Sequence, residues 1–265
     1  MELKVDLEWG DEGVVPETVH PDTAFIFDRM AEIIQEMIAP HSGERVLDVG
    51  CGRAADVLEL GKQGVKAIGI DCSDKMMRAA KSHLSDSEVA LVRGIGEALP
   101  FKKRSLDKII CKGALDHFAD PLKTMADMSQ ALKPEGAAII AIANFESLSC
   151  RLGRNWFLIV KRLYRKQGDI HPWIPPSDHN YRFDCPILKK TVADDFEIEK
   201  IRGMSMLWTA PYWGKFLSLL PRWTSSAILA LLDKIACRLP SLSDVIIIKL
   251  TPRGDQACGP LHIHR

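Results

Sequence analysis

The sequence carries no excess of either charge. Its 35 lysines and arginines balance 35 aspartates and glutamates, so the formal net charge at pH 7 is zero. A protein that attracts polynucleotides through its overall field needs a positive balance or a basic stripe. We therefore expect no nucleic-acid partner. The apolar fraction of 46% and the charged fraction of 26% are typical of a globular domain.

Long apolar runs and paired cysteine motifs are also missing. No run approaches the roughly 20 apolar residues of a membrane-spanning helix, and residues 1–8 lack the basic and apolar regions of a signal peptide. The seven cysteines are scattered and form neither a CxxC pair nor a Cys/His zinc spacing. His171 and His179 have no third ligand at a convincing spacing, so we predict no metal site. These absences predict a cytoplasmic protein with reduced thiols.

Hydrophobic periodicity divides the chain into alternating strands and helices. The expected strands are 45–49, 65–70, 89–92, 106–111, 137–143, 196–202 and 244–250. The expected helices are 23–39, 54–62, 74–84, 121–132 and 213–239, the last interrupted by Pro221, and 133–136 is expected to be a turn. This alternation predicts a doubly wound parallel α/β sheet, in which a ligand lies beyond the carboxyl ends of the strands.

The first expected strand leads into a glycine turn, VLDVGCG at 46–52. Glycines at 50 and 52 let the backbone turn tightly and approach a ligand without an intervening Cβ atom, and the next helix directs free N–H groups toward it. The stretch GCGRAA at 50–55 also fits the dinucleotide fingerprint, with Asp71 placed 21 residues after Gly50 as a ribose-binding acid. These features alone fit either a nicotinamide dinucleotide or S-adenosylmethionine.

Asp48 separates the two cofactors by charge. A carboxylate directly before the glycines would repel the pyrophosphate of a dinucleotide. S-adenosylmethionine has no phosphate, and its methionine end carries an ammonium group that an acid attracts. Asp48 therefore favours S-adenosylmethionine.

Five segments together resemble the class I (Rossmann-like) S-adenosylmethionine-dependent methyltransferases, especially the small-molecule group that includes the ubiquinone and menaquinone methylases. They are VLDVGCG at 46–52, DCSDKM at 71–76, EALPF at 97–101, LDHFAD at 115–120 and LKPEG at 132–136. The resemblance covers roughly residues 45–143. It implies one domain over 1–265: a seven-stranded sheet with helices on both faces and an antiparallel last strand, 244–250, beside the fifth. The cofactor core would be 43–143, and a helical cap would comprise 144–195 and 205–242.

The resemblance also implies roles in binding S-adenosylmethionine, with S-adenosylhomocysteine as the product. Asp48 and the two glycines would line the methionine portion, Asp71 would hold the ribose, and Met76 would pack against the adenine. Ile95 departs from the family, which usually has an adenine-binding acid at this position, so Glu97 or a backbone carbonyl would replace it. The implied cofactor contacts are Asp48, Gly50, Cys51, Gly52, Asp71, Cys72, Met76, Gly96, Glu97, Ala98, Lys112, Gly113 and His117.

His117 is the best candidate for a general base, because a neutral imidazole accepts a proton near pH 7. Methyl transfer is an in-line displacement that depends mainly on proximity, so a structural or gating role for His117 stays open. The polar and aromatic segment 177–183 resembles a lid over the acceptor. It supplies His179, Tyr181 and Arg182 as candidate substrate contacts, with an ordinary surface loop as the alternative.

The predicted reaction moves a methyl group to a small-molecule or lipid-like acceptor. The NPPY-type signature of nucleobase and amide methylation is missing after the fourth strand, where CKGA stands at 111–114. An apolar face with a basic complement over 151–166 predicts either a docked lid helix or a contact with an anionic membrane, and 212–239 allows membrane contact, an acceptor pocket or a homodimer contact. A non-catalytic binding module of the same fold and an NAD-dependent oxidoreductase are the alternative functions.

Overall fold

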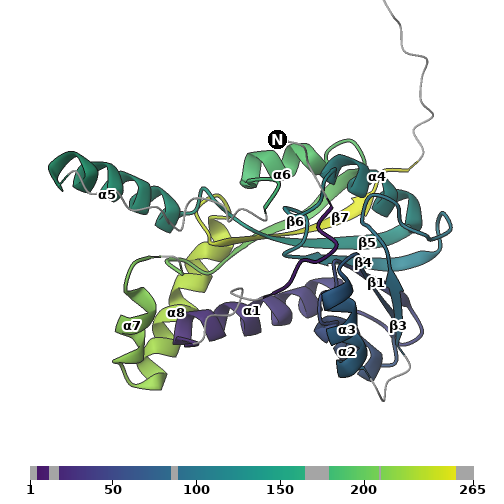
Figure 1. Cartoon of the computed structure of the whole chain (residues 1–265), viewed down its shortest axis with the longest axis horizontal. Helices are drawn as coiled ribbons and strands as arrows, with labels where there is room; N and C mark the ends of the chain where they lie inside the picture. The colour runs from purple at the N-terminus through teal and green to yellow at the C-terminus, as the bar shows by residue number, and fades with distance from the viewer. Residues whose placement is uncertain (1–4, 12–17, 85–88, 165–178, 209, 255–265) are drawn as a thin grey trace, which may run out of the picture.

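The computed structural model describes residues 5–11, 18–84, 89–164, 179–208 and 210–254, with the side chains of 158–164 excepted. Seven strands in this part of the chain form one sheet in the order β3-β2-β1-β4-β5-β7-β6 (Figure 1). The strands are β1 Arg45–Val49, β2 Lys66–Asp71, β3 Ala90–Arg93, β4 Leu106–Lys112, β5 Leu132–Ala143, β6 Phe196–Met204 and β7 Val245–Pro252.

The sheet is parallel from β3 to β5, and β7 inserts antiparallel between β5 and β6. The predicted seven-stranded sheet with an antiparallel last strand beside the fifth is therefore confirmed. Strand β1 pairs with β2 on one side and with β4 on the other. The chain thus reverses its direction of winding at β1, and ligands of doubly wound sheets bind beyond the strand ends at such a point.

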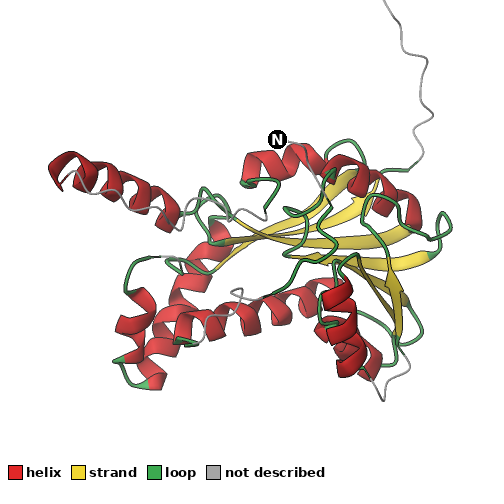
Figure 2. Cartoon of the chain, in the orientation of Figure 1, coloured by secondary structure: helices red, strands yellow, loops and turns green. Residues whose placement is uncertain are grey.

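Helices cover both faces of the sheet, as the doubly wound prediction requires (Figure 2). One buried cluster joins the sheet to α4 and α6, and a second joins it to α1, α2 and α3. Strand β7 serves both clusters, because Ile246 and Ile248 lie in the first and Val245 and Ile247 in the second. The helices are α1 Pro21–Ile38, α2 Ala55–Lys62, α3 Asp74–His83, α4 Pro121–Ala131, α5 Leu148–Tyr164, α6 Cys185–Val192, α7 Trp213–Ser218 and α8 Arg222–Arg238.

The expected turn at 133–136 is instead the start of β5, which follows α4 directly at Leu132. Pairing with β4 shifts register between Leu106 and Lys108. A Cβ atom on Gly136 would lie 2.8 Å from the carbonyl oxygen of Asp107. The glycine that suggests a turn in the sequence therefore permits a close approach of two strands.

The range 144–195, expected as cap, has two structural roles. Helix α5 projects from the body of the molecule (Figure 1). In contrast, Phe183, Leu188 and Val192 are buried in the α4 side of the core. Helices α7 and α8 pack against α1. Asp233 of α8 connects this helix to α1 and to the end of β6, because its carboxylate accepts hydrogen bonds from Arg29 Nε at 3.1 Å and from the Ser205 N–H at 3.2 Å. No described helix is long and apolar enough to cross a membrane.

Candidate functional site

A cavity of about 790 Å³ lies at the carboxyl ends of β1, β2 and β4. The loops after these strands and after β3 supply most of its wall. Ala98, His179, Tyr181 and Arg182 are not among the described residues that line it. The predicted cofactor contacts that do line it are Asp48, Gly50, Cys51, Gly52, Asp71, Cys72, Met76, Gly96, Glu97, Lys112, Gly113 and His117.

The turn after β1 brings backbone rather than side chains to the cavity. Gly50 and Gly52 have φ angles of +74° and +52°, in the left-handed region that glycine adopts at low cost. A Cβ atom on Gly50 would lie 2.4 Å from the Cβ atom of Ala114, so no larger residue fits there. At Gly52 and Gly113, by contrast, no described atom lies within 4 Å of an added Cβ. These two positions leave open space that a ligand can occupy.

Asp48 is a buried carboxylate at the base of this turn. Its side-chain oxygen Oδ1 has no hydrogen-bond partner among the described residues. Burial, reinforced by the charges of Asp56 and Asp71 and opposed by that of Lys112, raises the pKa of Asp48 to about 8. The Lys112 ammonium group is itself paired with the Asp56 carboxylate. A positively charged ligand would therefore satisfy Asp48 better than the surrounding protein does.

Asp71, at the end of β2, is held rigidly by two backbone amides. Its Oδ2 accepts a hydrogen bond from the Gly52 N–H at 2.9 Å, and its Oδ1 accepts one from the Ser73 N–H at 2.9 Å. Burial raises the pKa of Asp71 despite these hydrogen bonds. A carboxylate has about four lone-pair positions, so each oxygen can accept one further hydrogen bond from a diol.

Glu97 joins two of the loops that form the wall. Its Oε1 accepts hydrogen bonds from the Ala119 N–H at 2.7 Å and from the Asp120 N–H at 3.2 Å. One carboxylate oxygen of Glu97 is thus engaged in fixing the loop between β4 and α4. Ile95 also lines the cavity, in the place where the resemblance expects an acid.

The His117 side chain lies close to two other aromatic rings, those of Trp9 and His179, and His179 in turn contacts the acid Asp116. The His117 ring centroid is 4.3 Å from that of His179 and 5.2 Å from that of Trp9. The His179 Nε2 atom lies 3.2 Å from Asp116 Oδ2. The side chain of Asp116 is 3% exposed, and its Oδ1 has no hydrogen-bond partner among the residues described. Two of these residues, Asp116 and Trp9, are absent from the sequence-based candidates.

The backbone explains why His179 meets His117 although 62 residues separate them. The N–H groups of Asn180 and Tyr181 both donate to the Asp116 carbonyl, at 2.8 and 3.0 Å. The Asn180 side-chain amide donates to the His117 carbonyl at 2.6 Å. The Tyr181 hydroxyl donates to the Ala119 carbonyl at 3.0 Å. Segment 179–181 is thus fastened to the loop after β4, and Tyr181 takes part in that attachment.

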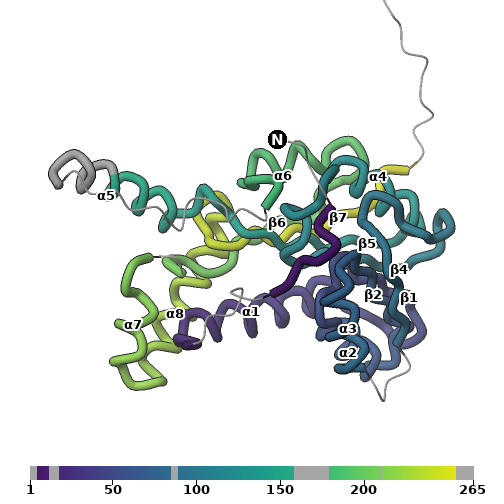
Figure 3. Tube along the Cα trace, viewed as in Figure 1, coloured from purple at the N-terminus to yellow at the C-terminus, as the bar shows by residue number. Residues whose placement is uncertain are grey.

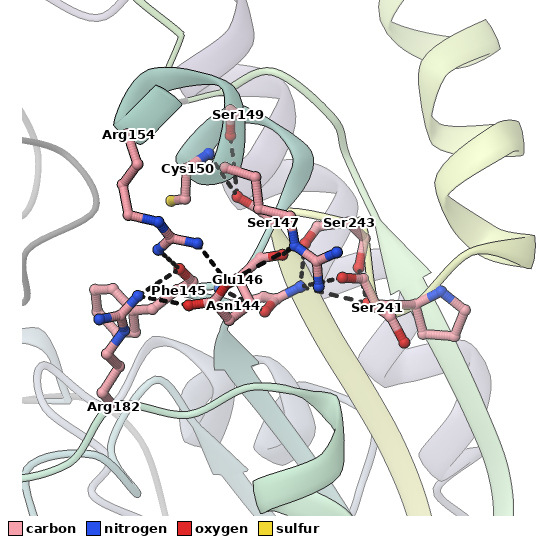
Figure 4. A network of polar contacts seen from close by, with 12 residues as sticks. Asn144, Phe145, Glu146, Ser147, Ser149, Cys150, Arg154, Arg182, Ser241 and Ser243 are labelled. Atoms are coloured by element: carbon pink, nitrogen blue, oxygen red, sulfur yellow. Dashed lines mark hydrogen bonds and ion pairs between the residues drawn. The ribbon is translucent and has the colours of Figure 1, made fainter. Parts of the chain in front are cut away.

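Arg182 belongs to a separate polar network at the start of α5. Its guanidinium group donates to Glu146 Oε1 at 2.6 Å and to the Phe145 carbonyl at 3.3 Å (Figure 4). Arg154 pairs with the same Glu146 carboxylate. The side-chain amide of Asn144, in the same view, donates to the Ser243 carbonyl at 2.8 Å. The described contacts of Arg182 therefore connect α5 to the body.

The N-terminal segment 5–11 forms one wall of the cavity, a role that no periodicity in the sequence indicates. Val5, Asp6, Trp9 and Asp11 are among the lining residues. The segment lies along the starts of α2 and α3 (Figure 3): the Trp9 carbonyl accepts from Ser73 Oγ at 2.6 Å, and Asp11 pairs with Arg53 at 2.5 Å. The attachment of Trp9 uses its carbonyl group, which every residue provides.

Comparison with known proteins identifies relatives of the cofactor core. Residues 47–140 match the family model described as a methyltransferase domain. The chain is 30% identical over 176 residues to a ubiquinone biosynthesis O-methyltransferase of Thiobacillus denitrificans, an alignment that covers 63% of this chain and 70% of the relative. An uncharacterized methyltransferase, YcgJ of Bacillus subtilis, is 33% identical over 99 residues, which cover 36% of this chain and 39% of the relative.

The chain covers less than two thirds of the length of two relatives. It covers 39% of the Bacillus protein. It covers 65% of a ubiquinone biosynthesis O-methyltransferase of Idiomarina loihiensis, which is 26% identical over 61% of this chain.

Solved structures share the fold. Phosphoethanolamine N-methyltransferase 2 of Haemonchus contortus, in complex with S-adenosyl-L-methionine, superposes with a TM-score of 0.57 at 14% identity, covering 86% of this chain and 53% of that one. The [4+2]-cyclase SpnF gives 0.57 at 17% identity, covering 86% and 81%. The fold therefore accommodates more than one reaction.

Proposed function

The chain belongs to the class I S-adenosylmethionine-dependent methyltransferases, and we propose that it transfers a methyl group from S-adenosylmethionine to a small-molecule or lipid-like acceptor. The observation that carries the proposal is the buried Asp48 carboxylate, whose Oδ1 lacks a partner among the described residues and whose pKa is raised to about 8. An uncompensated buried acid is costly. A ligand ammonium group would supply the missing partner.

The rest of the cavity fits the same cofactor. Gly52 and Gly113 leave room for the amino-acid portion, since nothing described lies within 4 Å of a Cβ atom at either position. The fixed Asp71 carboxylate offers two oxygens to a ribose diol. Met76, which is 1% exposed and lines the cavity, provides an apolar surface for adenine.

Three carboxylates at one end of the cavity disfavour a dinucleotide. Asp48, Asp56 and Asp71 all line it, and only Asp56 is paired with a lysine, Lys112. A pyrophosphate placed at the glycine turn would face the charge of Asp71 and would oppose ionisation of Asp48, whose pKa is already raised to about 8. An ammonium or sulfonium group is attracted by Asp71 and favours the ionised form of Asp48.

When bound, the cofactor supplies an electrophilic methyl group. The chain then has to orient the acceptor toward that methyl and keep water away. His117 lines the cavity, and Trp9 lies beside its ring at 5.2 Å. We place the acceptor at this end, where the N-terminal segment and segment 179–181 enclose the loop after β4. His117 would orient the acceptor or hold its proton there.

Isothermal titration calorimetry tests the choice of cofactor. S-adenosylhomocysteine is expected to bind with one-to-one stoichiometry, and NADH is expected to give no heat of binding. Tight binding of NADH without binding of S-adenosylhomocysteine would contradict the proposal. Tritium transfer from methyl-labelled S-adenosylmethionine to a panel of phenols, amines and lipids then distinguishes an enzyme from a non-catalytic binding module of the same fold.

We also propose that helices α7 and α8 place the protein on an anionic membrane surface. Tyr212, Leu219 and Trp223 are 80%, 84% and 75% exposed, which is unusual for large apolar side chains. Asp233, the one acid between residues 211 and 243, is buried and paired with Arg29. The exposed basic residues of this stretch are Lys215, Arg222, Lys234 and Arg238. Exposed aromatic groups with a basic surround are typical of interfacial helices.

Co-sedimentation with vesicles tests this surface. Binding is expected to phosphatidylglycerol vesicles and to be much weaker with phosphatidylcholine alone. The double variant Leu219→Ala/Trp223→Ala should lose most of the binding. Leu122→Ala, on α4 and 57% exposed, serves as the matched control and should retain it. Unaltered vesicle binding of the double variant would contradict the proposed membrane surface. Concentration-dependent dimerisation that the double variant abolishes would assign the surface to a second copy of the chain instead.

A further inference from the structure

We propose that Asp116, His117 and His179 form a binding site for a divalent transition-metal ion at the edge of the cavity, which His117 alone of the three lines. One ligand atom from each residue lies within 4.8 Å of the other two. The set consists of two imidazoles and one carboxylate. Zinc hydrolases, with two histidines and a glutamate, and the facial triads of non-haem iron sites use this combination of donors. The inference goes beyond the proposed methyl transfer and does not depend on it.

The distances suit a common ion. Two ligand atoms about 2.05 Å from a metal are about 3.3 Å apart at a tetrahedral angle and about 2.9 Å apart at a right angle. The His179 Nε2 and Asp116 Oδ2 atoms are 3.2 Å apart. The rings of His117 and His179 have centroids 4.3 Å apart and planes inclined by 49°, so they are not stacked face to face. Contraction of the remaining ligand separations by at most about 1.5 Å would close the site.

A second observation points to a ligand at this position. Asp116 is 2% exposed, yet its Oδ1 atom has no hydrogen-bond partner among the residues that the structure describes. Leaving a buried carboxylate oxygen unsatisfied costs free energy, and a cation would remove that cost. The pairing with His179 alone engages only the other oxygen, Oδ2.

The backbone around the three residues is fixed before any ion binds. The Asp116 carbonyl accepts hydrogen bonds from the N–H groups of Asn180 and Tyr181, directly after His179. The His117 carbonyl accepts one from the Asn180 side chain. The two segments that carry the ligands are therefore held together by contacts that do not involve the ligand side chains. Such preorganisation favours binding of the ion.

The protein supplies three ligands, which leaves at least one coordination position for a water molecule or a ligand atom. His117 lines the cavity. An ion held here would thus lie where we place the methyl acceptor. An acceptor with a hydroxyl or carboxylate oxygen would complete the coordination. For this last step the inference rests on the proposed function.

Cobalt(II) is a suitable probe, because its visible absorption reports the ligand set. The full chain, freed of any purification tag, is titrated with Co²⁺ and followed by absorption and equilibrium dialysis. We expect one ion per chain and a visible band, both removed by competing Zn²⁺. His179→Ala and Asp116→Asn should each weaken binding at least about tenfold. The thermal midpoint of each variant is recorded, and Asp116→Asn, which keeps the shape of the side chain, covers the case that His179→Ala unfolds.

Two controls test binding by three of the other histidines. His41→Ala, whose ring is 78% exposed, and the double variant His262→Ala/His264→Ala should bind Co²⁺ as the wild type does. Absence of stoichiometric binding, or binding that Asp116→Asn and His179→Ala leave intact, would overturn the site. Co²⁺ binding without binding of S-adenosylhomocysteine would refute the proposed function and leave the metal site standing.

Discussion

Asp48 gives the free energy of unfolding a pH dependence of defined sign. Burial, with the charges of Asp56 and Asp71, raises the pKa of Asp48 in the folded chain from 3.8 to about 8. Between these two values the folded chain holds a proton that the unfolded chain has released. A raised folded-state pKa contributes stability that is complete below the unfolded-state pKa and is lost as the pH rises toward the folded-state pKa. The expected slope is about −1.4 kcal/mol per pH unit.

Urea unfolding of wild type and Asp48→Asn at about pH 5.5 and pH 7.5 measures this effect. The asparagine does not titrate, so the variant retains the pH dependence of every other group. The stability of the wild type relative to the variant should fall by about 2.5 kcal/mol between the two pH values. A difference that stays constant would mean that Asp48 is already ionised in the folded chain, and the raised pKa that marks it as an uncompensated buried acid would be refuted.

Cofactor binding should remove the proton from Asp48. An ammonium group beside the carboxylate favours the ionised form, so binding of S-adenosylhomocysteine at about pH 6.5 should release a proton. Calorimetry in buffers with different ionisation enthalpies counts that proton. Asp48→Asn should lose both the proton release and much of the affinity.

Three further substitutions test the fold and the site. Gly50→Ala would place a Cβ atom 2.4 Å from Ala114 at a φ of +74°, and should lower the free energy of unfolding by about 2–4 kcal/mol in urea titrations. Asp71→Asn should weaken binding of S-adenosylhomocysteine by about 1.5–3 kcal/mol in calorimetry, since a charged acceptor of the ribose is lost. Asp233→Ala removes the buried acceptor of the Arg29 Nε and Ser205 N–H groups, while Arg29 keeps Glu32 at 2.7 Å, and should cost about 1–3 kcal/mol of stability. Unchanged values in any of these assays would contradict the corresponding contact.

The parts of the fold that follow local patterns could be predicted from the sequence. The apolar run at 245–250 and the glycine turn at 50–52 are both determined within a few residues, and both lie where the sequence suggests. Strand β5 begins earlier than its apolar run, because Leu132 pairs with Leu106 of the neighbouring strand and Gly136 leaves room for the Asp107 carbonyl. That contact depends on the sheet and has no local signal.

The residues of the candidate site also fall into those that local sequence places and those that only the folded chain brings together. Asp48 is the last residue but one of β1 and Asp71 is the last residue of β2, so the order of strands and turns places them. The approach of His179 to Asp116 results from hydrogen bonds between backbone groups 63 or more residues apart, and backbone groups carry no sequence signature. The contribution of Trp9 to the cavity also rests on carbonyl contacts. These residues become candidates only once the chain is folded.

A crystal structure with S-adenosylhomocysteine is the most direct test of the cofactor site. The ligand ammonium group should lie within hydrogen-bond distance of Asp48, and the ribose hydroxyls should lie on the two oxygens of Asp71. Ligand bound elsewhere, or with its ammonium group turned away from Asp48, would contradict the account.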